Sequence, residues 1–199
     1  KTVQLYFLMN AKSGLCAEDC TYCSQSKTSE AEIPRYNLLR RDDLLAGAQA
    51  AVDRQDKTYC IVISARGPNE REMAAVEQIV PEIKEKFGLD VCACLGLLTP
   101  DQAHRLKACG VDRVNHNLNT GGEFYSQICS THTYQDRVDT LRAVRSAGSF
   151  SSRRVRCVCS CVSSRASRGR ACAVRASAGW TSRARVPTRR RRPCSPVYT

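Results

Sequence analysis

Residues 59–95 read YCIVISARGPNEREMAAVEQIVPEIKEKFGLDVCACL, and they contain the smallest repeating unit of the predicted architecture. The stretch begins and ends in short apolar runs, 59–64 and 90–95, which are typical of buried strands. Between them, apolar residues recur every three or four positions over 69–87, the pattern of an amphipathic helix. A strand, a helix and a strand joined by short links predict a βαβ unit with two parallel strands.

The same alternation continues on both sides of this unit. Strands are expected at 3–9 and 111–115, and helices at 41–53, 99–108 and 133–147. About four βα units predict an α/β fold that corresponds to half of a TIM-type (β/α)8 barrel. Half a barrel leaves two unpaired sheet edges, so we expect the sequence to be a partial barrel.

Composition divides the chain into residues 1–148 and 149–199. The formal net charge is +12, and the last 51 residues contain 13 Arg, 10 Ser and 5 Cys but no acidic residue, Leu or Ile. Such a basic, low-complexity tail is expected to be disordered or irregular, because it has too little apolar surface to form a core. The abrupt change resembles a coding region read out of frame, and a frameshift is one hypothesis for it.

The tail and the apolar runs also bear on partners and location. A basic arm for nucleic acid is the functional alternative to a frameshift, but without interleaved aromatic residues no specific nucleic-acid binding is expected. No apolar run reaches the roughly 18 residues of a membrane span, and no secretory signal is recognisable. The clustered cysteines indicate metal chemistry in a reducing compartment.

The strongest chemical signal is the stretch GLCAEDCTYC at 14–23, with Cys16, Cys20 and Cys23 in C-x3-C-x2-C spacing after the first strand. Three thiolates can bind three irons of a [4Fe–4S] cluster and leave the fourth iron open. A structural zinc site normally needs four ligands. None is close in sequence, because the histidines are at 104, 116 and 132. The alternative is a zinc knuckle in a non-enzymatic basic metal-binding protein.

This loop, with the aromatic Tyr22 before its last cysteine, resembles the signature of the radical S-adenosylmethionine (SAM) superfamily. The flanking KSG and SQS, together with NHNLNT at 115–120 and THTYQDR at 131–137, resemble biotin synthase over residues 1–148. The resemblance implies that SAM binds the open iron and that radicals formed from it drive sulfur insertion into dethiobiotin. The alternative is another radical SAM enzyme, such as a relative in hydrogenase-cofactor or pyrrolysine biosynthesis.

The same resemblance implies partners and a location. An electron donor such as a flavodoxin or ferredoxin, a homodimer, and a cytoplasmic enzyme, mitochondrial in a eukaryote, are expected. It also implies a second, [2Fe–2S] cluster with Cys60 and Cys92 among its ligands. Cys94 is the rival of Cys92, since residues two apart on a strand share a face. Each of these thiols could instead be a small buried apolar residue.

The resemblance further implies that Tyr22, Asn117 and Asn119 contribute to cofactor binding. Asn117 and Asn119 would bind the SAM ribose, and Asn117 also the dethiobiotin ring, although asparagines are common in turns. Arg66 is a weaker candidate for the SAM pocket, His116 is expected to be a packed histidine, and Cys109 and Cys129 are expected to be incidental.

The resemblance ends near residue 148. Ser152 stands where the family has the third cysteine ligand of the sulfur-donating cluster, and the role is not transferred to Cys157, Cys159 or Cys161. The arginine ligand belongs to a later strand that is absent. We therefore expect a truncated, impaired chain that binds the [4Fe–4S] cluster but makes little or no biotin.

Overall fold

The structure is a computed structural model, and it describes residues 4–148. Its elements, in chain order, are β1 (Tyr6–Lys12), α1 (Arg41–Asp53), β2 (Thr58–Ile63), α2 (Glu70–Phe87), β3 (Asp90–Cys94), α3 (Pro100–Ala108), β4 (Arg113–Val114), the 3-10 turn η1 (Gly122–Phe124), α4 (Tyr125–Ile128) and α5 (Tyr134–Ser146). The predicted tail, 149–199, lies outside the described residues. So do Ser152 and the cysteines that follow it.

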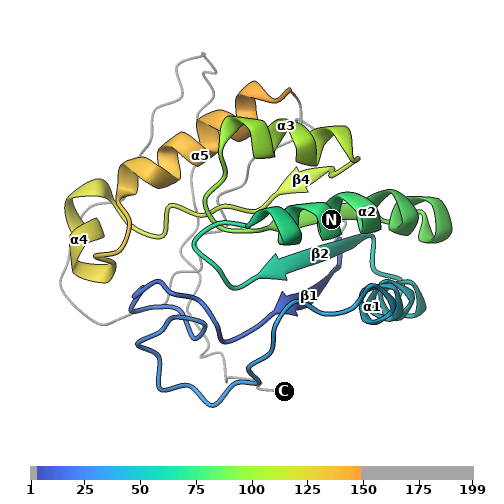
Figure 1. Cartoon of the computed structure of the whole chain (residues 1–199), viewed down its shortest axis with the longest axis horizontal. Helices are drawn as coiled ribbons and strands as arrows, with labels where there is room; N and C mark the ends of the chain where they lie inside the picture. Colours follow the sequence, from blue (N-terminus) through green and yellow to red (C-terminus); the bar gives the residue numbers. More distant parts are fainter. Residues whose placement is uncertain (1–3, 149–199) are drawn as a thin grey trace, which may run out of the picture. The chain divides into compact units, whose positions relative to one another are not determined.

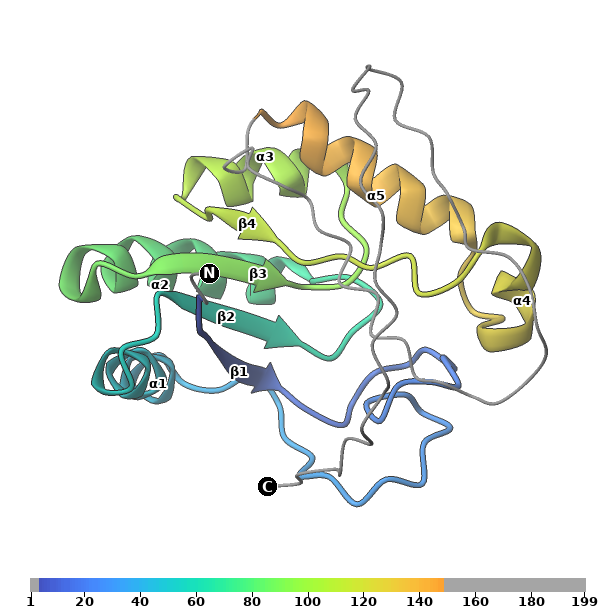
Figure 2. The same ribbon diagram turned by 180° about the vertical axis from the view of Figure 1, so that it is seen from behind.

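The strands form one parallel sheet in the order β1-β2-β3-β4 (Figures 1 and 2). The helices follow the same order, because α1 packs against α2, α2 against α3 and α3 against α5. Consecutive parallel strands with an outer layer of helices are the arrangement of a (β/α) barrel. The α/β fold with a parallel sheet that the sequence predicts is therefore confirmed.

The two faces of the sheet differ. On one face Tyr59, Ile61, Val91 and Ala93 are fully buried in the core beneath the helices. Alternation along each strand sends Cys60, Cys92 and Cys94 to the opposite face. Cysteines therefore lie on the face that corresponds to the barrel interior.

Side-chain caps explain where the helices begin. Asn69 and Thr99 each accept a hydrogen bond from the backbone N–H three residues on, and the Glu or Gln there binds back to the cap. Thr133 and Asp136 form the same reciprocal pair at the start of α5. Such capping boxes stabilise the first turn by satisfying its free N–H groups. The expected helix starts agree with these caps to within one residue.

The largest differences from the expected boundaries are in the strands. β1 begins three residues later than expected, because its pairing with β2 starts at Tyr6 opposite Thr58. β4 is only two residues long, since the Asp112 carboxylate accepts the Val91 N–H at 2.8 Å and thereby occupies a position that strand pairing would use. The short helices at 122–128 are not predicted from the sequence.

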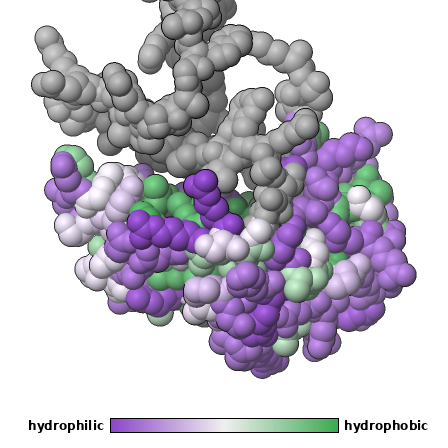
Figure 3. Space-filling view, turned by 90° about the horizontal axis from the view of Figure 1, so that it is seen from above, coloured by the Kyte–Doolittle hydropathy of each residue, from purple (hydrophilic) through white to green (hydrophobic). Residues whose placement is uncertain are grey.

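Figure 3 views the molecule from the side of α3 and α5, and most of the described surface visible there is hydrophilic. Within residues 4–148, no helix has both the length and the apolar character needed to span a bilayer.

Candidate functional site: a cysteine loop at the carboxyl edge of the sheet

The candidate site lies where the parallel strands end. The loop after β1 carries Cys16, Cys20 and Cys23, and the segment after β4 carries Asn117, Asn119 and α4. Figure 2 shows both segments extending from the tips of the strand arrows on the same side of the molecule. Parallel strands bring their carboxyl ends to one edge, which is where barrel enzymes carry their active sites.

Hydrogen bonds within the cysteine loop fix its path. The Gln25 side-chain oxygen accepts from the Gly14 N–H at 2.6 Å and closes the start of the loop. The Cys23 N–H donates to the Cys20 carbonyl at 3.1 Å, and the Ser26 N–H donates to the Cys23 carbonyl at 3.1 Å. The SQS segment at 24–26 thus has a structural role, because its Gln25 side chain closes the loop.

The segment 128–132 anchors the loop from outside. The Thr21 N–H donates to the Ile128 carbonyl at 2.9 Å. The Asp19 carboxylate accepts from the N–H groups of Ser130 at 2.9 Å and Thr131 at 3.2 Å, and from the Ser130 hydroxyl. The Ser130 hydroxyl and its N–H, followed by further hydrogen bonds, lower the pKa of Asp19. Asp19 is therefore ionised and holds residues about 110 positions away against the loop.

Glu18 makes a second, buried set of contacts with the same segment. It is 5% exposed and accepts from the Thr131 hydroxyl at 2.6 Å. It also contacts the His132 ring and lies 3.5 Å from Arg66. Burial alone would raise the pKa of Glu18, but the hydrogen bonds from Thr131 and His132, together with the Arg66 charge, lower it.

Tyr22, Asn117 and Asn119 are brought together, and Arg137 joins them. The Tyr22 hydroxyl accepts a hydrogen bond from the Asn119 side-chain amide and another from Arg137 at 3.2 Å. Arg137 also donates to the Asn117 backbone carbonyl at 2.7 Å. Asn119 has φ +66°, a left-handed conformation that asparagine tolerates better than most residues. Asn119 therefore adopts a turn conformation and at the same time hydrogen-bonds Tyr22.

The three loop thiols fit the donor set of a [4Fe–4S] cluster with one open iron. Cys20 is buried, while Cys16 and Cys23 are half-buried. Burial raises the pKa of Cys16, and the charges of Glu18 and then Cys23 raise it further. Burial raises the pKa of Cys20 to about 11. Cysteine binds metal as the thiolate, so iron would have to displace the protons that these raised pKa values favour.

A second group of thiols lies on the sheet itself. Cys60 and Cys92 are direct partners in the register of β2 and β3. They share a hydrogen bond that raises the pKa of Cys60 and lowers that of Cys92, whose thiolate also benefits from the Arg113 charge. Burial raises the pKa of Cys94 to about 11. Only Cys92 pairs directly with Cys60, which favours it over Cys94 as the partner thiol. Two thiols are half of the four ligands that a [2Fe–2S] cluster needs.

The loops after β2 and β3 meet at a glycine contact. Gly96 has φ +85°, and a Cβ there would lie 2.4 Å from the Arg66 carbonyl oxygen. The Leu97 N–H donates to the same carbonyl at 2.6 Å. This close approach fixes the backbone of Arg66, whose side chain reaches Glu18 and the Thr131 carbonyl. Arg66 thus braces the cysteine loop against the segment after α4.

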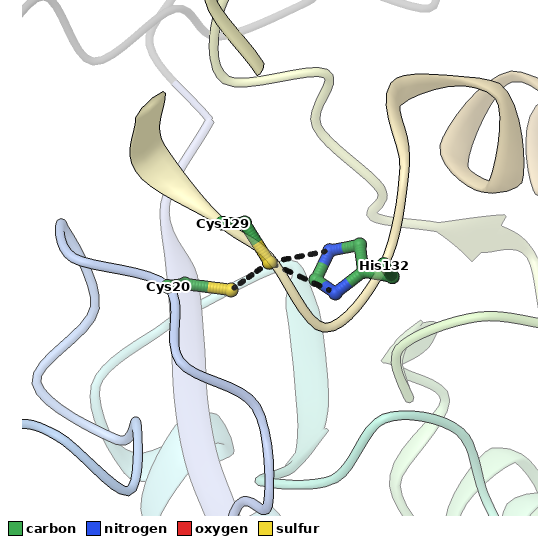
Figure 4. A group of neighbouring side chains, drawn as sticks. All are labelled: Cys20, Cys129 and His132. Atoms are coloured by element: carbon green, nitrogen blue, oxygen red, sulfur yellow. Dashed lines mark hydrogen bonds between the residues drawn. The ribbon is translucent and has the colours of Figure 1, made fainter. Parts of the chain in front are cut away.

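The fold places two further potential metal ligands beside the loop. No histidine or further cysteine is close to the loop in sequence, yet Cys129 and His132 lie beside Cys20. The Cys129 Sγ is 3.7 Å from the Cys20 Sγ (Figure 4). Periodicity and spacing could not reveal this contact, because the residues are 109 positions apart. His116 is packed as expected, and burial lowers its pKa to about 4.

Comparison with known proteins identifies the family of the chain. Residues 12–158 match the model of the radical SAM superfamily. The chain is 71% identical over 147 residues to a biotin synthase of Rhodopirellula baltica, covering 74% of this chain and 41% of the relative. It is 54% identical over 148 residues to a biotin synthase of Bacillus subtilis, covering 74% of this chain and 44% of the relative. The chain therefore spans less than half the length of these curated relatives.

Solved structures show the same fold at low sequence identity. The FeFe-hydrogenase maturase HydG from Carboxydothermus hydrogenoformans superposes with a TM-score of 0.65 at 18% identity, covering 73% of this chain and 34% of that one. Methylornithine synthase (PylB) superposes with a TM-score of 0.62 at 18% identity, covering 73% and 42%. Together with the cysteine loop at the carboxyl edge of a parallel sheet, the match over residues 12–158 shows that the chain belongs to the radical SAM superfamily.

Proposed function

We propose that residues 1–148 are the SAM-cleaving part of a biotin synthase-type enzyme. Cys16, Cys20 and Cys23 bind a [4Fe–4S] cluster, which when bound supplies the electron that cleaves SAM to methionine and a 5′-deoxyadenosyl radical. The observation that carries the proposal is the cysteine loop at the carboxyl edge of the sheet. The 71% identity to a biotin synthase favours dethiobiotin as the substrate.

Other residues of the chain would position SAM. Asn119 and Tyr22 are in hydrogen-bond contact, and Arg137 joins Tyr22 to the Asn117 carbonyl. In this proposal Asn117 and Asn119 hydrogen-bond the SAM ribose, and Asn117 also binds the ureido ring of dethiobiotin. A carboxamide suits both groups because it donates and accepts in one plane.

Cys60 and Cys92 would provide two ligands of the sulfur-donating [2Fe–2S] cluster. Their direct pairing across β2 and β3 supports this assignment over one that uses Cys94. The described residues offer these two thiols and no complete ligand set. We therefore propose that the 199-residue chain assembles the loop cluster and cleaves SAM, but forms little or no biotin.

The physiological setting belongs to the same proposal. The electron donor is a flavodoxin or ferredoxin, the enzyme is a homodimer, and it acts in the cytoplasm, or in the mitochondrion if the source is eukaryotic. The bacterial biotin synthases that the chain resembles support a cytoplasmic location.

The test is anaerobic reconstitution of the full-length chain with ferrous iron and sulfide, followed by dithionite and SAM. We expect about four irons and four sulfides in the loop cluster, with 5′-deoxyadenosine as a product. Cys16→Ser and Cys23→Ser should lose both, whereas Cys109→Ser, a half-buried thiol at the end of α3, should keep both.

Two outcomes would overturn the proposal. One bound zinc without sulfide would indicate the non-enzymatic metal-binding alternative. Faster 5′-deoxyadenosine formation with a substrate other than dethiobiotin, and no response to dethiobiotin, would indicate a different radical SAM enzyme. Measurable biotin formation by this chain would refute the statement that its sulfur-insertion site is incomplete.

A further inference from the structure

Three metal-binding side chains from distant parts of the sequence meet behind the cysteine loop. The Sγ atoms of Cys20 and Cys129 and a ring nitrogen of His132 all lie within 4.8 Å of one another. All three residues are buried, and Figure 4 shows the two thiols and the imidazole pointing toward one another. Cys129 and His132 have no part in the proposed SAM chemistry.

The spacing of the donor atoms matches that around a tetrahedral ion. Zinc–sulfur bonds of about 2.3 Å and zinc–nitrogen bonds of about 2.0 Å place two sulfurs roughly 3.8 Å apart, and a sulfur and a nitrogen roughly 3.5 Å apart. The Cys20 and Cys129 Sγ atoms are 3.7 Å apart. The His132 Nδ1 atom is 3.2 Å from the Cys129 Sγ. Three corners of the tetrahedron are thus nearly preformed.

Surrounding groups orient the imidazole. The Tyr125 hydroxyl lies 2.9 Å from the His132 Nε2 atom, and this contact fixes the ring with Nδ1 toward the thiols. In the metal-free chain Nδ1–H donates to the buried Glu18 carboxylate, since Nε2 accepts from Arg137 at 3.2 Å. An ion that binds Nδ1 must therefore displace this proton and the Glu18 contact. Metal-binding histidines are commonly held through the nitrogen that does not bind the metal, and here that contact is the one between Tyr125 and Nε2.

A route from solvent reaches the group. An open pocket of about 520 Å³ is lined by residues of α4 and the start of α5, among them Tyr125, Cys129 and His132. Cys20 does not line this pocket, but its Sγ atom lies 3.7 Å from that of Cys129, which does. An ion can therefore reach the donors without passing through the sheet.

We propose that Cys20, Cys129 and His132 form a second metal site, which binds one thiolate-preferring divalent cation such as Zn²⁺ in the cluster-free chain. Because Cys20 serves both sites, the ion and the loop cluster exclude each other. The inference rests on the proposed function only for this exclusion. Zn²⁺ generally binds such N and S donors more tightly than Fe²⁺, so zinc would retard cluster assembly.

Cobalt(II) is the probe, because its absorption reports both thiolate ligation and tetrahedral geometry. The full-length, metal-free chain is titrated anaerobically against a competing chelator. Five cysteines outside the described residues are replaced by serine in every sample: Cys157, Cys159, Cys161, Cys172 and Cys194. We expect one tightly bound Co²⁺ per chain with thiolate charge-transfer absorption.

Matched variants separate this site from the cluster loop. Cys129→Ser should weaken Co²⁺ binding by at least about tenfold, since loss of even a supporting contact to a metal ligand costs 10- to 100-fold. It should also remove about half of the thiolate absorption. Cys16→Ser, the same substitution in the cluster loop, should leave the affinity within about threefold. The reverse pattern would assign the metal to the loop thiols and overturn the proposal.

Two further measurements test the site with a second variant and separate its failure from a failure of the loop cluster. His132→Asn should weaken Co²⁺ binding while leaving both thiolate bands, and unchanged binding would also overturn the proposal. Preloaded Zn²⁺ should slow iron–sulfur reconstitution of the parent chain but not of Cys129→Ser. Cys129→Ser should still take up about four irons, so a failure of the second site is distinguishable from a failure of the loop cluster.

Discussion

Glu72 links the first turn of α2 to the end of β1, directly before the cysteine loop. Its Oε1 atom lies 2.9 Å from the Lys12 Nζ, and the two side chains are 5% and 17% exposed. Its Oε2 atom accepts the Asn69 N–H at 2.9 Å. We predict that Glu72→Gln destabilises the chain, because it leaves the Lys12 ammonium largely buried without a counter-charge.

The expected magnitude follows from this geometry. Removing one partner of a buried ion pair costs about 3–5 kcal/mol. Glutamine keeps an oxygen that can accept the Asn69 N–H, so the capping contact survives. Lys12 also retains some access to water. We therefore expect a loss of about 2–3 kcal/mol in the free energy of unfolding, just below the range for a fully buried pair. With a urea m-value of about 2 kcal/mol/M, the midpoint falls by about 1–1.5 M.

The assay is urea unfolding of the full-length, cluster-free chain under reducing, anaerobic conditions, followed by far-ultraviolet circular dichroism. Glu85→Gln is the matched control, because Glu85 lies on the same helix but is exposed. It should leave the midpoint unchanged. If Glu72→Gln shifts the midpoint no more than Glu85→Gln does, the ion pair contributes nothing and the reasoning is refuted.

Three other predictions use the same unfolding assay. Gly96→Ala should lower the free energy of unfolding by more than about 2 kcal/mol, because the new Cβ would lie 2.4 Å from the Arg66 carbonyl oxygen. Gly88→Ala, at φ +63° with open space around it, should cost only about 1 kcal/mol; equal costs would contradict the proposed clash. Thr140→Val should lower the free energy of unfolding by about 1–2 kcal/mol, because the hydroxyl that accepts the Leu98 N–H at 3.2 Å is lost. Thr140→Ser keeps this hydroxyl and should lose only about 0.8 kcal/mol, for the buried methyl group. The folded pKa of Glu18 is lowered from 4.5, so its stabilisation is complete above that pH and is lost as the pH falls through the folded pKa. Glu18→Gln should therefore flatten the acid side of the stability profile, and a profile parallel to the parent would contradict this.

The sequence predicts the fold well because its signals are local. Alternating apolar runs and caps such as Asn69 and Thr99 specify each βα unit from residues within a few positions of one another. The short β4 escapes prediction because its limit is set by Asp112, whose carboxylate binds the backbone of a neighbouring strand. No periodicity in 111–115 contains that information.

The sequence predicts the cysteines of the site but not the residues that hold the cysteine loop in place. Spacing identifies Cys16, Cys20 and Cys23, because a cluster loop needs its thiols close together in the chain. The contacts of Arg66 and Arg137 join segments separated by 48 and 115 residues. Their partners are hydroxyls, backbone carbonyls, one carboxylate and the His132 imidazole, and no sequence signature pairs them with these arginines.

The external anchoring of the cysteine loop has a consequence for biosynthesis. Its partners, Ile128 to His132, emerge from the ribosome more than 100 residues after Cys20. At 5–20 residues per second, the loop waits for them for about 5–20 s. During that interval the nascent chain exposes three thiols without their hydrogen-bonded frame. Iron delivery that depends on the finished frame must therefore wait until residues 128–132 have emerged, and the thiols are open to premature capture until then.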